Sequence, residues 1–316
     1  MTTTYPDSVR FLYALGNEIK TAKLGLGPMR ALMSALGDPH RRLRVIHAAG
    51  TNGKGSTCAM IEAGLRFAGY KTGLYTSPHL IEPTERIRIN GLPVTPQQFQ
   101  ETFATVHTVA ERLVHLEILE HHPTYFETVT AMAFLLFERA AIDFLVCETG
   151  LGGRLDATNI VEPELTLITA IDFDHEQYLG NTILAIAGEK AGIIKPAVTV
   201  ICARQPNREA EDVILRRASE LGAPVINLRH WPIEDLLITA YGSQYLVHDG
   251  LHVKCPLAGR HQVDNSLTAM AALEKLGVSP EGIQATVWPG RLEHVPTRPE
   301  IILDRKSTRL NSSHRH

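Results

Sequence analysis

The residue types and spacing that a phosphate-binding loop requires occur together in one segment, Gly50-Thr51-Asn52-Gly53-Lys54-Gly55-Ser56-Thr57. Glycine lets backbone N–H groups approach phosphate oxygens, and lysine adds a mobile positive charge. The apolar run Leu43–Ala49 before the segment predicts a buried strand, and Cys58–Ala68 after it predicts a helix. A glycine-rich turn between strand and helix presents unpaired N–H groups and a favourable dipole to an anion. This context indicates phosphate binding.

The segment departs from the standard phosphate loop at two positions. That loop has glycine where this chain has Ala48, and a hydroxyl directly after the lysine, where this chain has Gly55. The hydroxyl is delayed to Ser56. A shortened phosphate loop of this kind is rarer than the standard loop, so its presence is a more specific sign of phosphate binding. The flanking strand and helix weaken the simpler interpretation, a turn of small residues that caps an ordinary helix.

The rest of the chain indicates the sheet that must position this loop. Short apolar runs alternate with helical patterns, which is typical of a mostly parallel sheet covered by helices on both faces. The predicted strands are Leu43–Ala49, Thr72–Tyr75, Phe144–Glu148, Leu165–Ile171, Val198–Ala203 and Pro224–Leu228. The predicted helices are Cys58–Ala68, Pro96–Leu119, Phe126–Ala140, Arg208–Leu221, Asn265–Leu276 and Glu281–Thr286.

A different pattern occupies the region near 234–257. Leu236–Tyr241, Gln244–His248 and Leu251–Cys255 predict strands separated by tight turns, and hence a small antiparallel element. The strand-like run Ile301–Asp304 is followed abruptly by residues 305–316, a basic segment rich in Ser and His. This segment predicts a disordered or artefactual tail.

Polar residues follow several of the predicted strands. Thr76 and Ser77 follow the second strand, Glu148 ends the third, and Asp174 and His175 follow the fourth. Ligands of an open parallel sheet bind beyond the carboxyl ends of its strands. Carboxylate and hydroxyl oxygens beside a phosphate loop suit magnesium and a nucleotide. Histidine is an unusual magnesium ligand, so hydrogen bonding to a metal-bound water or proton transfer is an alternative role.

Each of these residues has a simpler interpretation when taken alone. Ser77 before proline is also a common turn residue, Glu148 a solvated strand end, and His175 a loop histidine. Their joint placement at strand ends favours a site.

Composition excludes several classes of protein. The chain has 316 residues and a net charge of −3, so it offers no electrostatic case for nucleic-acid binding. Its four cysteines are far apart, without metal spacing or a secreted framework. Residues 1–7 lack a signal-peptide pattern, and no apolar run approaches the ~20 residues that span a membrane. A cytoplasmic protein follows as the expectation.

Several motifs together resemble bacterial folylpolyglutamate synthase/dihydrofolate synthase, a Mur-type ligase, over about residues 8–304. They are Gly50–Ser56, Thr76-Ser77-Pro78-His79-Leu80, Glu148–Asn159, Asp174-His175 with Leu179-Gly180, and Glu189-Lys190-Ala191-Gly192-Ile193. The resemblance implies ATP-dependent addition of L-glutamate to dihydropteroate or to folates, through an acyl phosphate. It also implies two Mg²⁺ sites, K⁺ as a further candidate cation, and a monomer.

The resemblance assigns roles to individual residues. It implies catalytic roles for Lys54, His175 and Lys190. It implies ATP binding by Thr51, Asn52, Gly53, Lys54, Gly55, Ser56, Asn265, Arg291 and Asp304. It implies metal binding by Ser77, Glu148, His175 and Lys190, the last as a carbamate, because an apolar environment lowers the pKa of a lysine.

Substrate-binding segments are implied in the same way. The pterin-binding positions are Thr76, Thr124, Tyr125, Phe126, Glu127, Leu155, Asp156 and Ala157. A further pterin segment of the family falls on Ala22-Lys23-Leu24, with lysine where an acid is usual.

The chain leaves the family pattern after Asp304. We expect residues 1–296 to form the ATP-binding domain, residues 297–304 to begin a C-terminal ligase domain, and that Rossmann-like domain to be largely missing. A chain without it is expected to bind Mg-ATP weakly and to ligate poorly. The alternatives are a non-catalytic nucleotide-binding fragment and a P-loop kinase or NTPase.

Overall fold

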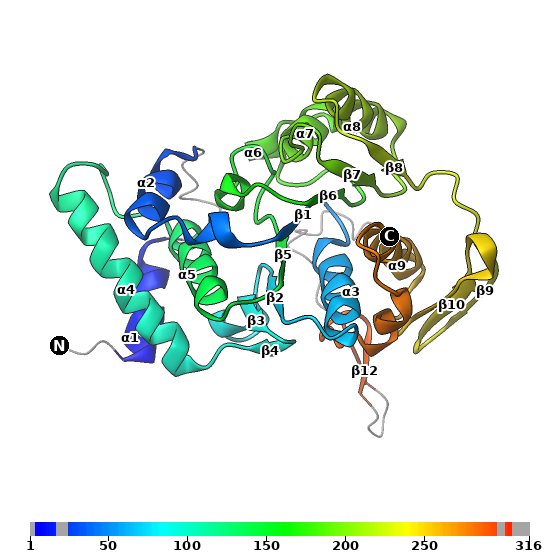
Figure 1. Cartoon of the computed structure of the whole chain (residues 1–316), viewed down its shortest axis with the longest axis horizontal. Helices are drawn as coiled ribbons and strands as arrows, with labels where there is room; N and C mark the ends of the chain where they lie inside the picture. Colours follow the sequence, from blue (N-terminus) through cyan, green and yellow to red (C-terminus); the bar gives the residue numbers. More distant parts are fainter. Residues whose placement is uncertain (1–3, 17–24, 296–300, 305–316) are drawn as a thin grey trace, which may run out of the picture.

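The computed structural model describes residues 4–16, 25–295 and 301–304 (Figure 1). Its main element is an eight-stranded sheet with the order β4-β3-β2-β5-β1-β6-β7-β8. All pairs from β2 to β8 are parallel, and β3 and β4 add an antiparallel edge. The strands are β1 Val45–Ala49, β2 Thr72–Tyr75, β3 Ile87–Ile89, β4 Leu92–Pro93, β5 Phe144–Glu148, β6 Leu165–Ile168, β7 Thr199–Cys202 and β8 Val225–Asn227.

Helices cover both faces of this sheet. Alternate residues of β1 point to opposite faces, so Val45 and Ala49 contact different core clusters from Ile46 and Ala48. One face carries α1 Tyr5–Ala14, α2 Gly27–Ala35, α4 Pro96–His115, α5 Tyr125–Arg139, α7 Ile183–Ala191 and α8 Arg208–Glu220. The other face carries α3 Lys54–Phe67 and α9 Arg260–Lys275, which lie side by side in Figure 1. The predicted mostly parallel sheet between helices is therefore confirmed.

The predicted small antiparallel sheet is present and packs against α9, with its first two strands beginning two residues before their predicted starts. Its order is β11-β10-β9, with β9 Glu234–Thr239, β10 Gly242–Leu246 and β11 His252–Cys255. Tyr245 and Val253 join the same core cluster as α3 and α9. A two-stranded sheet pairs β12 Glu293–Val295 with β13 Ile301–Leu303.

The structure corrects several predicted elements. The segment predicted as a helix at Glu281–Thr286 is a 3₁₀ helix, η5 Pro280–Ala285. Helix α3 begins at Lys54 rather than Cys58, because Gly53 takes the left-handed conformation that ends the loop. The strands are also one to three residues shorter than several predicted runs. The sequence reading missed α1, α2, α7 and the short α6 Glu176–Leu179.

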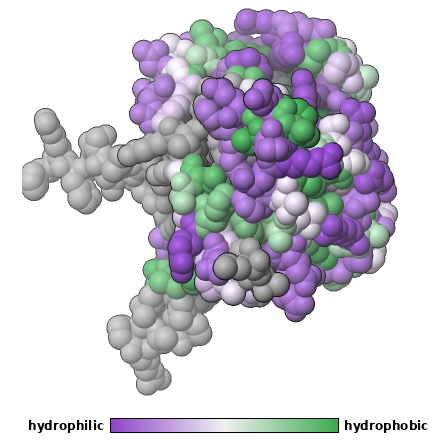
Figure 2. Space-filling model, turned by 90° about the vertical axis from the view of Figure 1, so that its left-hand side faces the viewer, coloured by the Kyte–Doolittle hydropathy of each residue, from purple (hydrophilic) through white to green (hydrophobic). Residues whose placement is uncertain are grey.

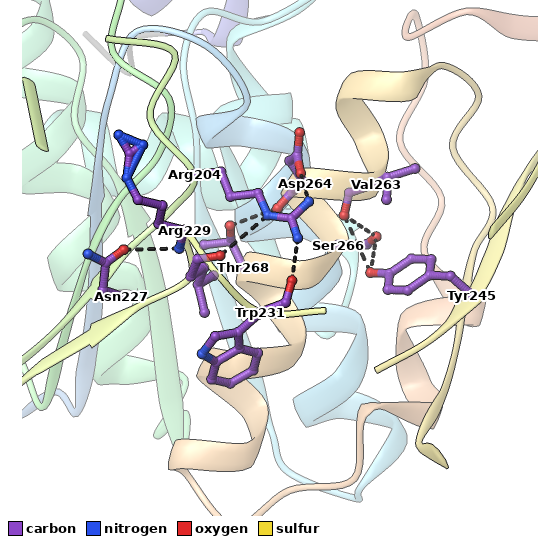
Figure 3. A network of polar contacts seen from close by, with 10 residues as sticks. Arg204, Asn227, Arg229, Trp231, Tyr245, Val263, Asp264, Ser266 and Thr268 are labelled. Atoms are coloured by element: carbon purple, nitrogen blue, oxygen red, sulfur yellow. Dashed lines mark hydrogen bonds and ion pairs between the residues drawn. The ribbon is translucent and has the colours of Figure 1, made fainter. Parts of the chain in front are cut away.

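A polar network ties the end of β7 to α9 (Figure 3). The Arg204 guanidinium donates to Asp264 Oδ1 at 3.1 Å and also to the carbonyls of Leu228 and Trp231. On the far side of α9, the Tyr245 hydroxyl is 2.8 Å from Ser266 Oγ. These contacts fix α9 against both sheets, and Arg204 and Asp264 line the cavity described below.

Among the described residues, no helix combines the length and the apolar character that crossing a membrane requires.

Candidate active site

The predicted phosphate loop is held tightly between β6 and α9. The N–H groups of Thr51 and Asn52 both donate to the Ala170 carbonyl at 3.0 Å. Gly53 has φ 85°, and a Cβ on it would lie 2.0 Å from Asn265 Oδ1. Only glycine fits such a close approach at a left-handed backbone. The loop therefore has a fixed shape before any ligand binds.

Two lysines meet at this loop. Lys54 Nζ donates to the Gly50 carbonyl at 2.8 Å and to the Thr51 carbonyl at 3.3 Å. Lys190 Nζ, from α7, donates to the same Gly50 carbonyl at 2.8 Å. Burial, reinforced by the charge of Lys54, lowers the pKa of Lys190 to about 7. The loop thus concentrates positive charge, and one of its two amines is partly neutral at physiological pH.

A buried carboxylate lies beside the loop. Glu148 ends β5 and accepts a hydrogen bond from the Ser77 N–H at 3.1 Å. A Cβ on Gly55 would be 3.4 Å from Glu148 Oε2, so the carboxylate lies against the first turn of α3. Burial raises the pKa of Glu148, and the charge of Lys54 opposes that shift. The structure therefore brings Ser77 and Glu148 together at the loop.

His175 follows β6 and has the left-handed φ of 46°. Its Nε2 lies 3.6 Å from Asp174 Oδ2. Burial lowers the pKa of His175, with the Asp174 carboxylate acting in the opposite direction. A largely neutral imidazole therefore faces the same cavity as the loop.

A cavity of about 770 Å³ unites the loop with Ser77, Glu148 and His175, whereas Lys190 is buried behind the loop and is not among the lining residues. The predicted residues that line the cavity are Thr51, Asn52, Gly53, Lys54, Gly55, Ser56, Thr76, Ser77, Glu148, His175, Asn265, Arg291 and Asp304. Asp304 Oδ1 accepts from the Leu292 N–H at 3.3 Å, which holds it beside the Arg291 turn. Residues from opposite ends of the chain therefore enclose one cavity.

Sequence reasoning missed several residues of the cavity wall. Trp288 faces Gly55, and the Arg88 guanidinium lies 5.1 Å from the Trp288 ring centroid. Gln262 donates to Ser56 Oγ at 3.3 Å and accepts from Asn265 at 2.9 Å. Trp288 lies three residues before the predicted ATP-binding residue Arg291, and this closeness in sequence is a signal that could have found it.

The comparisons with known proteins agree with this geometry. The Mur ligase middle domain matches residues 48–273. The chain is 40% identical to the dihydrofolate synthase/folylpolyglutamate synthase of Bacillus subtilis, covering 96% of this chain and 73% of that protein. The corresponding protein of Escherichia coli is 36% identical, with coverages of 90% and 66%.

Solved structures give the same result. The folylpolyglutamate synthase of Mycobacterium tuberculosis complexed with ADP and AMPPCP superposes with a TM-score of 0.84 at 33% identity, covering 95% of this chain and 71% of that one. The chain belongs to the folylpolyglutamate synthase/dihydrofolate synthase group of Mur ligases. A synthase of this group in complex with AMPPCP and folate has a TM-score of 0.85 at 31% identity, over 95% of this chain and 76% of that one.

In this Mur ligase the residues of the predicted pterin segment at the start of α5 cap that helix and pack against neighbouring side chains. Thr124 and Glu127 form a capping box, with both the N–H and the hydroxyl of Thr124 donating to Glu127 Oε2 at 2.8 Å. The Tyr125 ring stacks on Tyr13 at 5.8 Å. Phe126 packs under Gly150, where a Cβ would meet the ring at 2.4 Å. Thr124–Glu127 thus support the cavity wall from behind.

The second predicted pterin segment, residues 155–157, also makes its hydrogen bonds within its own loop. The Asp156 carboxylate accepts from the N–H groups of Gly150 and Leu151, both at 2.8 Å, and from the N–H and hydroxyl of Thr158. Leu155 and Ala157 flank it and, like Asp156, do not line the cavity. The remaining segment, Ala22-Lys23-Leu24, lies within residues 17–24, which are outside the described residues. Pterin contacts therefore stay a prediction, as does the domain boundary at residue 296.

Proposed function

We propose that this protein uses ATP to join L-glutamate to a pterin-linked carboxylate, that of dihydropteroate or of a folate. The observation that carries the proposal is the meeting of Lys54 and Glu148 at a preformed phosphate loop in one cavity, with the buried amine of Lys190 bonded to the Gly50 carbonyl of that loop. The reaction brings two anions, a carboxylate and the γ-phosphate, into contact. Positive charge held in place beforehand stabilises such an encounter.

The proposed chemistry has two steps. A carboxylate oxygen of the pterin substrate attacks the γ-phosphorus, and the bond between that phosphorus and the ADP oxygen breaks. The glutamate amine then attacks the acyl carbon, loses a proton, and displaces inorganic phosphate as the amide forms. Lys54 offsets charge on the phosphates in the first step. As the alternative to a ligand role, His175, whose pKa burial lowers, would accept a proton in the second.

The residues at the loop fit Mg²⁺. Glu148 is a buried carboxylate that accepts one hydrogen bond, from the Ser77 N–H, among the described residues. Burial disfavours its charged form, and a bound cation would stabilise that form. The Ser77 hydroxyl and His175 are the neighbouring candidate ligands, and a carbamate on Lys190 would add oxygen ligands for a second ion. Bound magnesium would neutralise the phosphate oxygens. No feature of the described residues points specifically to K⁺.

The nucleotide is proposed to extend from the loop toward α9. Residues 51–56 would hold its phosphates, and Asn265, Arg291 and Asp304 would surround the rest of it within the same cavity. Thr76 lines the cavity, as the other predicted pterin residues among the described residues do not, so we propose it for direct contact with the pterin. The segments 124–127 and 155–157 would shape the pterin site from behind.

The test is release of phosphate that depends on both acceptor and glutamate. The purified protein is incubated with Mg-ATP, with and without L-glutamate, and with dihydropteroate or tetrahydrofolate, and the products are identified by mass spectrometry. We expect a product heavier by one glutamyl residue. Glutamate-independent ADP release would favour a kinase or NTPase. ATP binding without turnover would favour a nucleotide-binding module.

A further inference from the structure

A second cluster of ionisable side chains lies on α4, and none of its members lines the cavity. His107 Nδ1 is 3.1 Å from His122 Nε2 and 4.0 Å from Glu111 Oε1. One ligand atom from each of the three residues lies within 4.8 Å of the other two. His107 and Glu111 are neighbours on one face of the helix, and the turn after α4 brings His122 back to them. Three potential donors therefore converge on one point.

The hydrogen bonding of His122 prepares it as a ligand. Its Nδ1 lies 2.8 Å from the Pro123 carbonyl, which can only accept, so the proton of neutral His122 is on Nδ1. The lone pair is then on Nε2, the atom that faces His107. Such a bond from the other ring nitrogen to a carbonyl is the usual arrangement around metal-bound histidine, because it fixes both tautomer and ring orientation.

The ring of His107 is held just as firmly. It stacks on Phe103 at 5.3 Å with an interplanar angle of 8°, and Phe11 of α1 packs edge-on at 4.5 Å. Phe11 also contacts His122 at 5.3 Å. Burial, together with His122, lowers the pKa of His107, so the imidazole is neutral and able to ligate at neutral pH. Ligands held in this way lose little freedom on binding.

We propose that His107, Glu111 and His122 form a binding site for Zn²⁺ or a cation of similar preference, with the remaining position open to water. Two imidazole nitrogens and a carboxylate suit such ions and not Mg²⁺. At zinc–nitrogen distances of about 2.0–2.1 Å, two nitrogens of a tetrahedral site are roughly 3.4 Å apart. The observed 3.1 Å separation of the histidine nitrogens needs only a small adjustment. His107 would move its proton from Nδ1 to Nε2, with no net change in charge.

The cluster is open to solvent on one side. Figure 2 views the side of the molecule at the left of Figure 1, where α4 lies, and that face mixes hydrophilic residues with separate apolar patches. The Glu111 side chain is largely exposed, so an ion can reach the three residues from solvent. The bound ion would join α4 to the segment just before Thr124, where α5 begins. It would therefore brace the start of α5.

The experiment measures Zn²⁺ binding by the full chain without ATP or folate, by competition with a chromophoric chelator, and Co²⁺ binding by visible absorption. We expect one equivalent to bind and to raise the Tm. Glu111→Gln and His122→Gln should each weaken binding by about tenfold or more, since even residues behind metal ligands contribute roughly 10–100-fold. Because no substrate is present, the result is independent of the ligase activity.

The matched control is His121→Gln. His121 is the next residue to His122, but its exposed side chain pairs with Glu120 instead of joining the cluster. Its removal should leave Zn²⁺ affinity unchanged, and histidines elsewhere in the chain are the same in every variant. Glu111 is largely exposed, so Glu111→Gln tests the site without a risk to folding. Equal affinity in the wild type and Glu111→Gln, or an equal loss in His121→Gln, would overturn the proposal.

Discussion

Glu148 and Asp156 are buried carboxylates on the same stretch of chain, yet their surroundings are opposite. Asp156 accepts four hydrogen bonds, all from its own loop. Glu148 has one recorded donor, the Ser77 N–H, and faces Lys54. Burial raises the pKa of both groups. The difference separates a carboxylate that organises a loop from one whose charge needs a ligand.

The same distinction divides the two regions around them. At the phosphate-loop edge, Lys54 and Lys190 crowd one carbonyl, and Glu148 lies against the first turn of α3. The supporting region comprises residues 124–127 and 155–157, where polar groups bond to neighbours in the same segment. The Thr124 hydroxyl donates to Glu127, and Asp156 accepts from the Thr158 N–H. Substitutions at the edge should therefore reduce activity and spare stability, and substitutions in the supporting region should do the reverse.

The largest effect is expected for Lys190→Ala. It removes an amine whose pKa of about 7 permits carbamylation, so turnover should fall by at least about 10²–10³-fold, the usual loss of a charge-stabilising group. A small added carboxylate should restore part of the activity. A ¹³C-carbonate NMR experiment should show a carbamate signal that the variant lacks. Lys195→Ala is the control and should retain turnover, because Lys195 is only partly buried and its amine donates to the Asn159 carbonyl, away from the loop. Wild-type-like rates in Lys190→Ala would refute the role.

The second prediction concerns Glu148→Gln, which should lower turnover by roughly 10²-fold while the protein stays folded. The pKa of Glu148 is raised above its ordinary 4.5, so the folded state holds the proton more tightly than the unfolded state. Wild-type stability should therefore fall as pH rises from about 4.5 through the folded pKa, and then level off. The variant should lack this loss.

Urea unfolding of both proteins across that pH range gives the difference in unfolding free energy. The difference should increasingly favour Glu148→Gln as pH rises. A variant that is less stable at neutral pH would show that Glu148 is a structural group like Asp156, and the contrast between the two regions would disappear.

The sequence predicted the strands and the phosphate loop well because local patterns determine them. Thr72–Tyr75 and Phe144–Glu148 matched β2 and β5, and the loop residues from Thr51 to Ser56 line the cavity. Long-range contacts explain what was missed. Trp288 and Gln262 reach the loop only through the packing of distant segments. The few polar residues of α7 gave no clear period, so that helix was overlooked although it carries Lys190.

The third prediction concerns Asp156→Asn. An amide presents an NH₂ group where the carboxylate accepted bonds from Gly150, Leu151 and Thr158, so some of those buried donors lose their acceptor. The free energy of unfolding should fall by about 1–3 kcal/mol. Denaturant unfolding measures the loss, and the KM for ATP should change little. A fully stable Asp156→Asn variant with lost turnover would assign Asp156 to the reaction instead.

The smallest effect is expected for Thr124→Ala, which removes the N-cap of α5 but no group on the cavity wall. Loss of such a cap costs about 1 kcal/mol of stability. Because the cap fixes the start of α5, where Tyr125 stacks on Tyr13 and Phe126 supports Gly150, the KM for the pterin substrate should rise modestly. The KM for ATP should not change.

Thr124→Ser separates the capping role from direct recognition. Serine keeps the hydroxyl that accepts from the Glu127 N–H, so this variant should regain both stability and pterin KM. If Thr124→Ala instead raised the pterin KM by tenfold or more without loss of stability, the Thr124 hydroxyl would contact the substrate. The supporting region would then belong to the binding surface itself, because a group that only caps a helix cannot weaken binding without also weakening the fold.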